Sequence, residues 1–303
     1  MWLTLRSLAL ACTFALAACS GGDAASDPPP SDNQTTNGQP GPLLYEIANA
    51  DGEIEGWMLG TIHALPDGAQ WRTPKIDQII KDADAMVVEI ASLEDRETIG
   101  RLFRQMATTP GLEPLPQRVN ADLRQPLRDM IELSDFAPQD LDEMESWAAA
   151  ISISRVGATG RPRNGVDRFL LYKFRGRTVY GFELPGEQLG IFDALAERDQ
   201  RDLLEGTVRE WMNAREKPGW LTEAWLNGDV ETLERATTIG IMADPELREA
   251  LLTARNDRWM PTLLSKLETT DRLFVAVGTG HIVGPDGLPA LLKENGFTVR
   301  RME

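Results

Sequence analysis

The only two histidines of the chain close the same short phrase near opposite ends of the sequence. Residues 60–63 and residues 278–281 both read Gly-Thr-x-His. Each is followed by an apolar pair and then Pro-Asp-Gly, with one extra residue in the second copy. Each phrase also follows an apolar run that is typical of a strand, residues 57–59 and 273–277. We therefore expect the fold to bring distant segments together, so that the two phrases form two halves of one site.

Strand and helix patterns extend along the rest of the chain. Apolar runs predict strands at residues 43–48, 55–60, 85–90, 178–183, 272–277 and 297–300. Helical spacing predicts helices within residues 75–83, 93–106, 121–133, 138–156, 168–174, 187–216, 221–226, 245–267 and 288–294. An Asp-Gly pair between the first two runs favours a hairpin and argues against a purely parallel sheet. The expected fold is α/β or α+β: a central mixed β-sheet with many packed helices, in which the phrases are pseudo-symmetric strand-turn-helix units placed side by side.

The N-terminus has the features of a targeting segment. Arg6 precedes an apolar stretch, residues 8–18, that is too short to span a bilayer. This stretch ends in Leu-Ala-Ala-Cys, which resembles the lipobox of bacterial lipoproteins. Residues 1–18 are thus predicted to be a lipoprotein signal peptide that leaves Cys19 as the lipidated N-terminus. An ordinary signal peptide cut near Ala18 is the alternative.

The predicted mature chain consists of a tether and one domain. Residues 19–41 are polar and proline-rich, which favours a flexible tether, and residues 42–303 are expected to form the domain. No later stretch is apolar and long enough to cross a membrane, so attachment would be through the lipid at Cys19 alone. The serine after this cysteine fits sorting to the outer membrane, facing the periplasm.

Charge and composition exclude several classes of function. The net charge of −16 argues against a nucleic-acid partner, because phosphate binding needs a basic face. Cys12 and Cys19 are the only cysteines, so the mature domain has neither a disulfide nor a thiol nucleophile. The chain has no Gly-Lys-Ser/Thr loop and no Gly-x-Ser-x-Gly elbow. Gly278-x-Gly280 only faintly resembles a dinucleotide fingerprint, because Val283 and Pro285 interrupt it.

Histidine and glutamate residues at strand ends predict a metal site. The glycine three residues before each histidine lets the backbone turn sharply at the strand end, where α/β sheets bind ligands. Glu89 and Glu183 end apolar strands, where a bare carboxylate is costly unless it is paired or bound to metal. His63, His281, Glu89 and Glu183 are therefore the candidate ligands of a divalent ion that activates water, with a second carboxylate as general base.

Simpler interpretations of the same residues stay open. A histidine after a strand is often a polar turn residue, and a strand-end glutamate is often half of an ion pair. Asp167 is interpreted as an N-cap of the helix at residues 168–174 rather than as a ligand.

The chain resembles the TraB/PrgY/GumN family, which is related to the Tiki metalloproteases. The likeness covers residues 43–301. It rests on residues 60–63, 87–90, 165–167, 181–183 with Gln188, 255–256 with Trp259, and 278–281. The resemblance implies paired Gly-x-x-His motifs and a glutamate at a metal-dependent hydrolytic centre, with manganese or cobalt as the ion. The candidate ions are Mn, Co or Zn. Carried over, His63, Glu89 and His281 would hold the metal, and Arg255 or Asn256 would assist catalysis.

These observations lead to one main functional hypothesis and two alternatives. The main hypothesis is a lipid-anchored, divalent-metal-dependent hydrolase, most simply a peptidase acting on a peptide or protein. In it Glu89 and the metal activate water, and Arg255 steadies the oxyanion. The first alternative is an envelope lipoprotein that binds or sequesters a peptide or haem without turnover. The second is a structural lipoprotein in which the histidines are incidental.

Overall fold

The computed structural model of the protein describes residues 41–302. The predicted signal peptide, Cys19 and nearly all of the predicted tether lie outside the described residues. Within residues 41–302, no helix has both the length and the apolar character needed to cross a membrane.

One mixed β-sheet organises the described part of the chain. Its strands are β1 Leu44–Ala48, β2 Ile54–Thr61, β3 Ala85–Val88, β4 Thr178–Gly181, β5 Leu273–Gly278 and β6 Thr298–Arg301. They lie in the order β4-β3-β5-β2-β1-β6. The neighbours among β4, β3, β5 and β2 are parallel, whereas β1 is antiparallel to both β2 and β6. The prediction of an α/β fold on a mixed sheet is confirmed, and β1 is the strand that keeps the sheet from being purely parallel.

The pairing of β2 with β5 brings the two Gly-Thr-x-His phrases together. Gly60 lies opposite Val277 and Thr61 lies opposite Gly278, so both phrases leave the same edge of the sheet on adjacent strands. The close approach depends on Gly56, where a β-carbon would lie 2.2 Å from the carbonyl oxygen of Leu273. Segments from the two ends of the chain therefore become direct neighbours.

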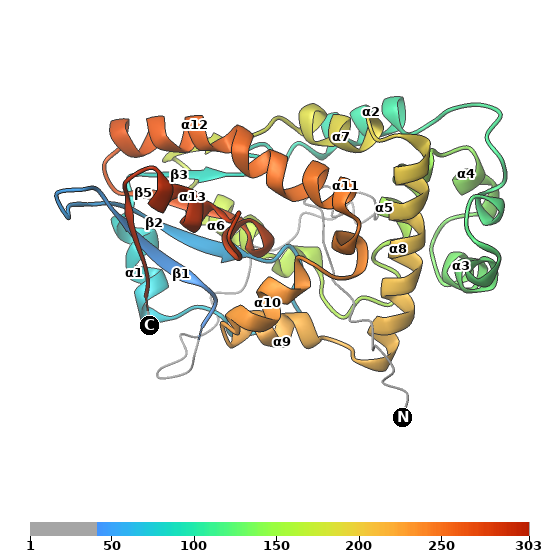
Figure 1. The fold of residues 1–303 in the computed structure, drawn as a ribbon, viewed down its shortest axis with the longest axis horizontal. Coiled ribbons are helices and arrows are strands. Elements are labelled where there is room, and N and C mark those ends of the chain that lie inside the picture. Colours follow the sequence, from blue (N-terminus) through green and yellow to red (C-terminus); the bar gives the residue numbers. More distant parts are fainter. Residues whose placement is uncertain (1–40, 303) are drawn as a thin grey trace.

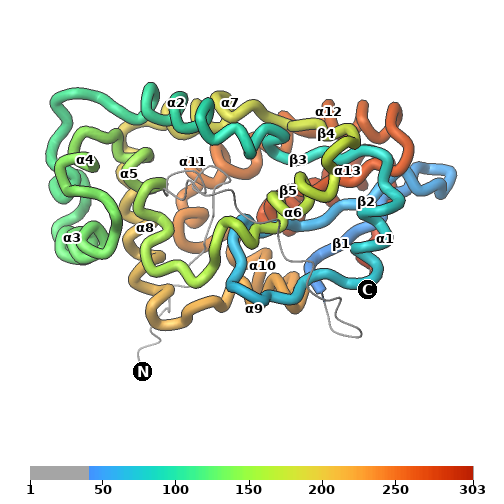
Figure 2. Tube along the Cα trace, turned by 180° about the vertical axis from the view of Figure 1, so that it is seen from behind, coloured from blue at the N-terminus to red at the C-terminus, as the bar shows by residue number. Residues whose placement is uncertain are grey.

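Helices cover both faces of this sheet. Helices α12 (Ala254–Thr269) and α13 (Leu288–Glu294) lie over the face that is nearer in Figure 1, and α6 (Val166–Lys173) lies over the face that is nearer in Figure 2. Phe174, directly after α6, stacks on Phe274 of β5 with ring centres 6.0 Å apart. Parallel strands need cover on both faces, and the fully buried interior of β5 fits that requirement.

The carboxyl ends of the parallel strands point towards a helical half of the molecule (Figure 1). The helices of this half are α2 Arg96–Met106, α3 Arg124–Glu132, α4 Pro138–Asp142, α5 Ser146–Ile153, α7 Pro185–Asp193 and α8 Glu197–Glu216. The remaining helices are α1 Pro74–Asp82, α9 Trp220–Leu226, α10 Val230–Ala236 and α11 Pro245–Arg248. Short helical turns are η2 Leu115–Gln117, η3 Ala121–Leu123, η4 Pro162–Asn164, η5 Gly240–Ala243, η6 Glu249–Thr253 and η7 Thr279–Ile282.

The structure breaks one predicted helix and contains one that the sequence did not predict. The single helix expected within residues 138–156 is broken into α4 and α5, because the backbone N–H of Glu145 donates to the carbonyl of Ala107 at 2.7 Å instead of continuing a helix. The break turns α5 into the core, where all of its residues are buried. Helix α10 was not predicted, although its start carries a recognisable cap in which Asp229 accepts from the N–H of Thr232 at 3.1 Å.

Candidate functional site

Four acid or base side chains follow the carboxyl ends of the four neighbouring parallel strands. In the order β4, β3, β5, β2 across the sheet, these residues are Glu183, Glu89, His281 and His63. The carboxyl edge of a parallel sheet is where α/β proteins bind ligands, because the strands end there and the following turns project their side chains over one crevice. The sheet therefore gathers residues that are far apart in the sequence.

Gly278 leaves the space in which three of these side chains converge. A β-carbon at Gly278 would lie 2.9 Å from Oε1 of Glu89, 3.7 Å from Cδ2 of His281 and 3.9 Å from Nε2 of His63. The backbone N–H of Gly278 also donates to Oε1 of Glu89 at 2.9 Å. Space therefore requires the glycine, whereas its backbone conformation (φ −50°, ψ 137°) is open to other residues.

Asp167 fixes the ring of His63. Its Oδ2 lies 2.6 Å from Nδ1 of His63, and its Oδ1 accepts from the hydroxyl of Thr61 at 2.8 Å. The interpretation of Asp167 as an N-cap is wrong, because Gly165 is the N-cap of α6 and Asp167 lies buried in its first turn. The helix starts earlier than expected because the N–H of Val166 donates to the carbonyl of Ile62. Asp167 is therefore a partner of the first histidine.

Asn256 fixes the ring of His281 in the same way. Its Oδ1 lies 2.6 Å from Nδ1 of His281, and its Nδ2 donates to the carbonyl of Asp286 at 2.8 Å, which sets the orientation of the amide. An amide oxygen only accepts, so Nδ1 of His281 carries the proton and Nε2 keeps its lone pair. In both histidines an oxygen thus holds Nδ1 and leaves Nε2 facing the site.

The guanidinium of Arg255 links the carboxylates to the second histidine. Its Nη2 donates to Oε2 of Glu89 and to Oε2 of Glu183, each at 2.8 Å, and its Nε donates to Oε1 of Glu183 at 3.0 Å. Its Nη1 lies 3.2 Å from Nε2 of His281. All four side chains are buried, so each charge depends on its partners.

A π-helical turn places Arg255 and Asn256. The turn η6 directly precedes α12, and Nη1 of Arg255 donates back to the carbonyl of Leu251 within η6 at 3.2 Å. Single π turns inside helices often occur at functional sites. Four residues further along α12, the indole N–H of Trp259 donates to Oε1 of Glu183 at 3.0 Å, and its ring lies 4.4 Å from that of His281.

The site separates the protonation states of its three central groups. Burial raises the pKa of Glu89, but Arg255 and the two histidines outweigh burial and hold that pKa well below its usual range. Burial, followed by the charge of Arg255, lowers the pKa of His281 to about 3. Burial also lowers the pKa of His63, but the charge and hydrogen bond of Asp167 outweigh it and raise the pKa to about 8. At neutral pH Glu89 is therefore anionic, His281 neutral and His63 protonated.

Gln188 adds a buried acceptor to the site. Its Nε2 donates to Oε2 of Glu89 at 3.3 Å and to Oε2 of Glu183 at 3.4 Å, which directs its Oε1 away from the carboxylates. Among the described residues this Oε1 has no hydrogen-bond partner. A buried acceptor of this kind fits a water molecule or a substrate N–H.

A divalent cation fits these donors on one condition. As the side chains stand within residues 41–302, no three His, Cys, Asp or Glu groups form a metal-binding cluster. Nη1 of Arg255 lies 3.2 Å from Nε2 of His281, so a guanidinium stands beside one of the donors. If that contact opens, Nε2 of His63, Nε2 of His281 and Oε1 of Glu89 supply two imidazoles and a carboxylate. Metal-binding histidines usually donate their other N–H to an oxygen, as Asp167 and Asn256 arrange here.

The structure brings together the residues that the sequence singled out. Glu89, His281, Arg255 and Asn256 lie in one hydrogen-bonded network, and His63 faces it beside Gly278. Glu183 joins the network through Arg255, Gln188 and Trp259.

Two sets of site contacts were not predicted from the sequence. The sequence pattern did not show that Asp167, itself held by Thr61, would contact His63. It also did not show that Gln188 would donate hydrogen bonds to the two carboxylates. The available signal was that each of these residues lies within, or directly after, a stretch that carries the family resemblance.

Comparison with known proteins gives a family but no close relative. The model of the TraB/PrgY/gumN family matches residues 43–301, and the chain belongs to this family. No curated protein matches the chain. No solved structure matches it either.

The buried ion pairs of Arg255 predict a large effect on stability. Arg255→Met leaves the carboxylates of Glu89 and Glu183 buried without their cation, so we expect the free energy of unfolding to fall by roughly 3–5 kcal/mol. Urea unfolding followed by circular dichroism measures the change.

Arg258→Met is the matched control. Arg258 lies on the same helix, is 53% exposed, and approaches Glu183 only to 3.9 Å. The control is expected to cost less than about 1 kcal/mol. Equal losses in the two variants would show that the Arg255 network does not hold the site together.

Proposed function

We propose that this member of the TraB/PrgY/gumN family is a divalent-metal-dependent hydrolase of peptide bonds. One observation carries the proposal: His63, His281 and Glu89 converge on Gly278 while oxygen atoms of Asp167 and Asn256 hold both Nδ1 atoms. Two imidazoles and one carboxylate form a frequent donor set of catalytic divalent ions. Mn, Co and Zn are the candidate ions.

Each residue of the network has a defined task in this proposal. His63, His281 and Glu89 would hold the ion, and the low pKa of Glu89 keeps its carboxylate charged over the working range. Bound there, the ion would supply Lewis-acid chemistry that makes water nucleophilic near neutral pH. Arg255 would keep its two carboxylate partners and, once His281 holds the ion instead, would donate from Nη1 to the reacting carbonyl, where a fixed cation stabilises an oxyanion.

A second candidate function is peptide binding without turnover. The contact of Arg255 Nη1 with Nε2 of His281 favours it, because a guanidinium then stands where the ion would bind. Metal dependence distinguishes the two functions, because sequestration of a peptide needs neither a metal ion nor cleavage.

The proposed location is the bacterial envelope. The apolar stretch at residues 8–18 and the Leu-Ala-Ala-Cys sequence that ends at Cys19 support a lipid anchor. Cys19→Ser is expected to move the protein from the detergent phase to the aqueous phase in a Triton X-114 partition of cell extracts. Unchanged partition of the variant would contradict the anchor.

Metal analysis of the purified protein tests the hydrolase. We expect titration calorimetry with Mn²⁺, Co²⁺ and Zn²⁺ to show one site, and we expect cleavage of a mixed peptide library to stop in chelator and return when metal is restored. His63→Ala and His281→Ala should each lose stoichiometric binding while circular dichroism shows an intact fold. Metal-free protein that cleaves peptides, or variants that bind metal as the wild type does, would contradict this proposal. Peptide binding without metal or cleavage would support sequestration.

The raised pKa of His63 predicts how metal affinity depends on pH. An ion can bind Nε2 only after His63 loses its proton, so apparent affinity should fall about tenfold for each pH unit below about 8 and level off above it. Asp167→Asn removes the charge that raises this pKa. In this variant the pH below which metal affinity begins to fall should therefore move in the acidic direction. Metal binding at high pH should weaken by about 10–100-fold.

Asp67→Asn is the control for this measurement. Asp67 is exposed and pairs with Arg161 and Arg163, outside the network. It should leave the pH profile unchanged. If metal affinity in Asp167→Asn still begins to fall near pH 8, Asp167 does not set the pKa of His63.

A further inference from the structure

A cavity of about 250 Å³ lies against the chain segment that carries the first histidine. Ile62 and Ala64 line this cavity, whereas His63 between them turns its ring to Asp167 in the candidate site. The cavity and the site thus share one short stretch of backbone. Its volume is slightly below the usual range of ligand pockets, roughly 300–1,000 Å³, which limits it to a small group.

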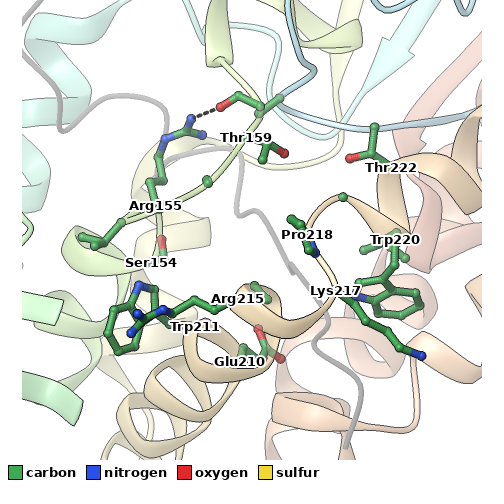
Figure 3. Close-up of a pocket in the computed structure, with 18 of the residues that line it drawn as sticks. Ser154, Arg155, Thr159, Glu210, Trp211, Arg215, Lys217, Pro218, Trp220 and Thr222 are labelled. Atoms are coloured by element: carbon green, nitrogen blue, oxygen red, sulfur yellow. Dashed lines mark hydrogen bonds between the residues drawn. The ribbon is translucent and has the colours of Figure 1, made fainter. Parts of the chain in front are cut away.

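Three segments and Ile241 form the other walls, as Figure 3 shows for the three segments. Residues 154–160, after α5, form one wall, and the carboxyl end of α8 forms the second. Residues 217–222, which lead into α9, form the third. Apolar side chains from these segments, among them Val156 and Leu221, line the cavity together with polar ones.

The charged lining is mainly cationic although the protein is strongly acidic. Arg155, Arg215 and Lys217 line the cavity against the single carboxylate of Glu210, whereas the whole chain carries a net charge of −16. Oε1 of Glu210 already accepts from the backbone N–H of Ile241 at 3.1 Å. The cavity therefore offers an excess of positive charge to a ligand.

Arg155 is a partly buried cation of the cavity without a carboxylate partner among the described residues. It is half-buried, and its Nη2 donates to the carbonyl of Gly160 at 2.9 Å. Within residues 41–302 no carboxylate pairs with it, and burial, followed by the charge of Arg168, lowers its pKa. Partial desolvation without a compensating carboxylate is costly, and an anionic ligand would offset that cost.

Aromatic surface stands beside these cations. The guanidinium of Arg215 lies 5.0 Å from the centre of the Trp211 ring, and Trp220 lines the cavity from the opposite wall. An apolar group can pack on the indoles while a carboxylate meets the guanidinium groups. The lining therefore fits a small ligand that is apolar at one point and anionic at another.

We propose that this cavity binds the carboxyl-terminal residue of a peptide, with the terminal carboxylate at Arg155 and Arg215 and an apolar side chain against the tryptophans. The assignment of the ligand as a peptide rests on the proposed hydrolase function, whereas the requirement for an anion rests on the cavity alone. A peptide end held here lies against the segment that carries His63, which would direct the site to bonds near carboxyl termini.

Titration calorimetry on the purified protein tests the proposal with acetyl-Ala-Ala-Leu as the free acid and as the carboxamide. The buffer contains a chelator, so that no metal-dependent cleavage occurs. We expect the acid to bind about tenfold or more tightly than the amide, which is the effect of one charge-assisted hydrogen bond. Arg155→Gln and Arg215→Gln should each remove most of this preference.

Arg209→Gln is the matched control, because Arg209 lies on α8 but pairs with Asp122 and Glu205 instead of lining the cavity. It should keep the preference for the acid. If circular dichroism shows that Arg155→Gln does not fold, the exposed Arg215 decides the test. Equal binding of acid and amide, no binding of the acid at millimolar concentration, or an unchanged preference in folded variants would overturn the proposal.

The outcomes of this test and of the hydrolase test are separable. Calorimetry in chelator reports binding of the carboxylate without metal or turnover. A protein that cleaves peptides but binds acid and amide equally would refute the cavity assignment alone. A protein that prefers the acid but binds no metal would refute the hydrolase alone.

Discussion

The parallel pairing of β2 with β5 is the constraint on which the site depends. It joins a strand near the start of the domain to one near its end, and it sets Thr61 opposite Gly278. Because the side chains that matter follow these strands directly, the register of one strand pair fixes the separation of the two histidines. Adding β3 and β4 on the far side of β5 brings Glu89 and Glu183 to the same edge. A shift of register would separate the donors, since each sits within three residues of a strand end.

The charges at the carboxyl edge of the sheet then determine which ligands the site can hold. Two carboxylates buried side by side would repel each other, and the guanidinium of Arg255 makes their burial tolerable. The same guanidinium reaches Nε2 of His281, so one side chain both stabilises the site and competes for a potential ligand atom. This dual position makes Arg255 the residue that distinguishes hydrolysis from peptide binding. In one case it yields its contact with the histidine, and in the other it keeps that contact.

Much of the architecture could be predicted from the sequence because its signals are local. Strand periodicity, the Asp-Gly hairpin and the repeated phrase gave the mixed sheet and the meeting of His63 with His281. What could not be predicted depends on contacts between distant segments. The break before α5 follows from a hydrogen bond between Glu145 and Ala107, and the role of Asp167 follows from how α6 docks on the end of β2. The cavity was also invisible in the sequence, because its walls come from separate segments that are ordinary when taken singly.

The two histidines are proposed to hold one ion together, and pulsed EPR of the protein loaded with Mn²⁺ can detect each imidazole ligand. We expect nitrogen couplings from two imidazoles in the wild type, and from one imidazole in any residual bound ion of His63→Ala or His281→Ala. A spectrum without nitrogen coupling, like that of Mn²⁺ bound by oxygen ligands and water alone, would contradict the claim.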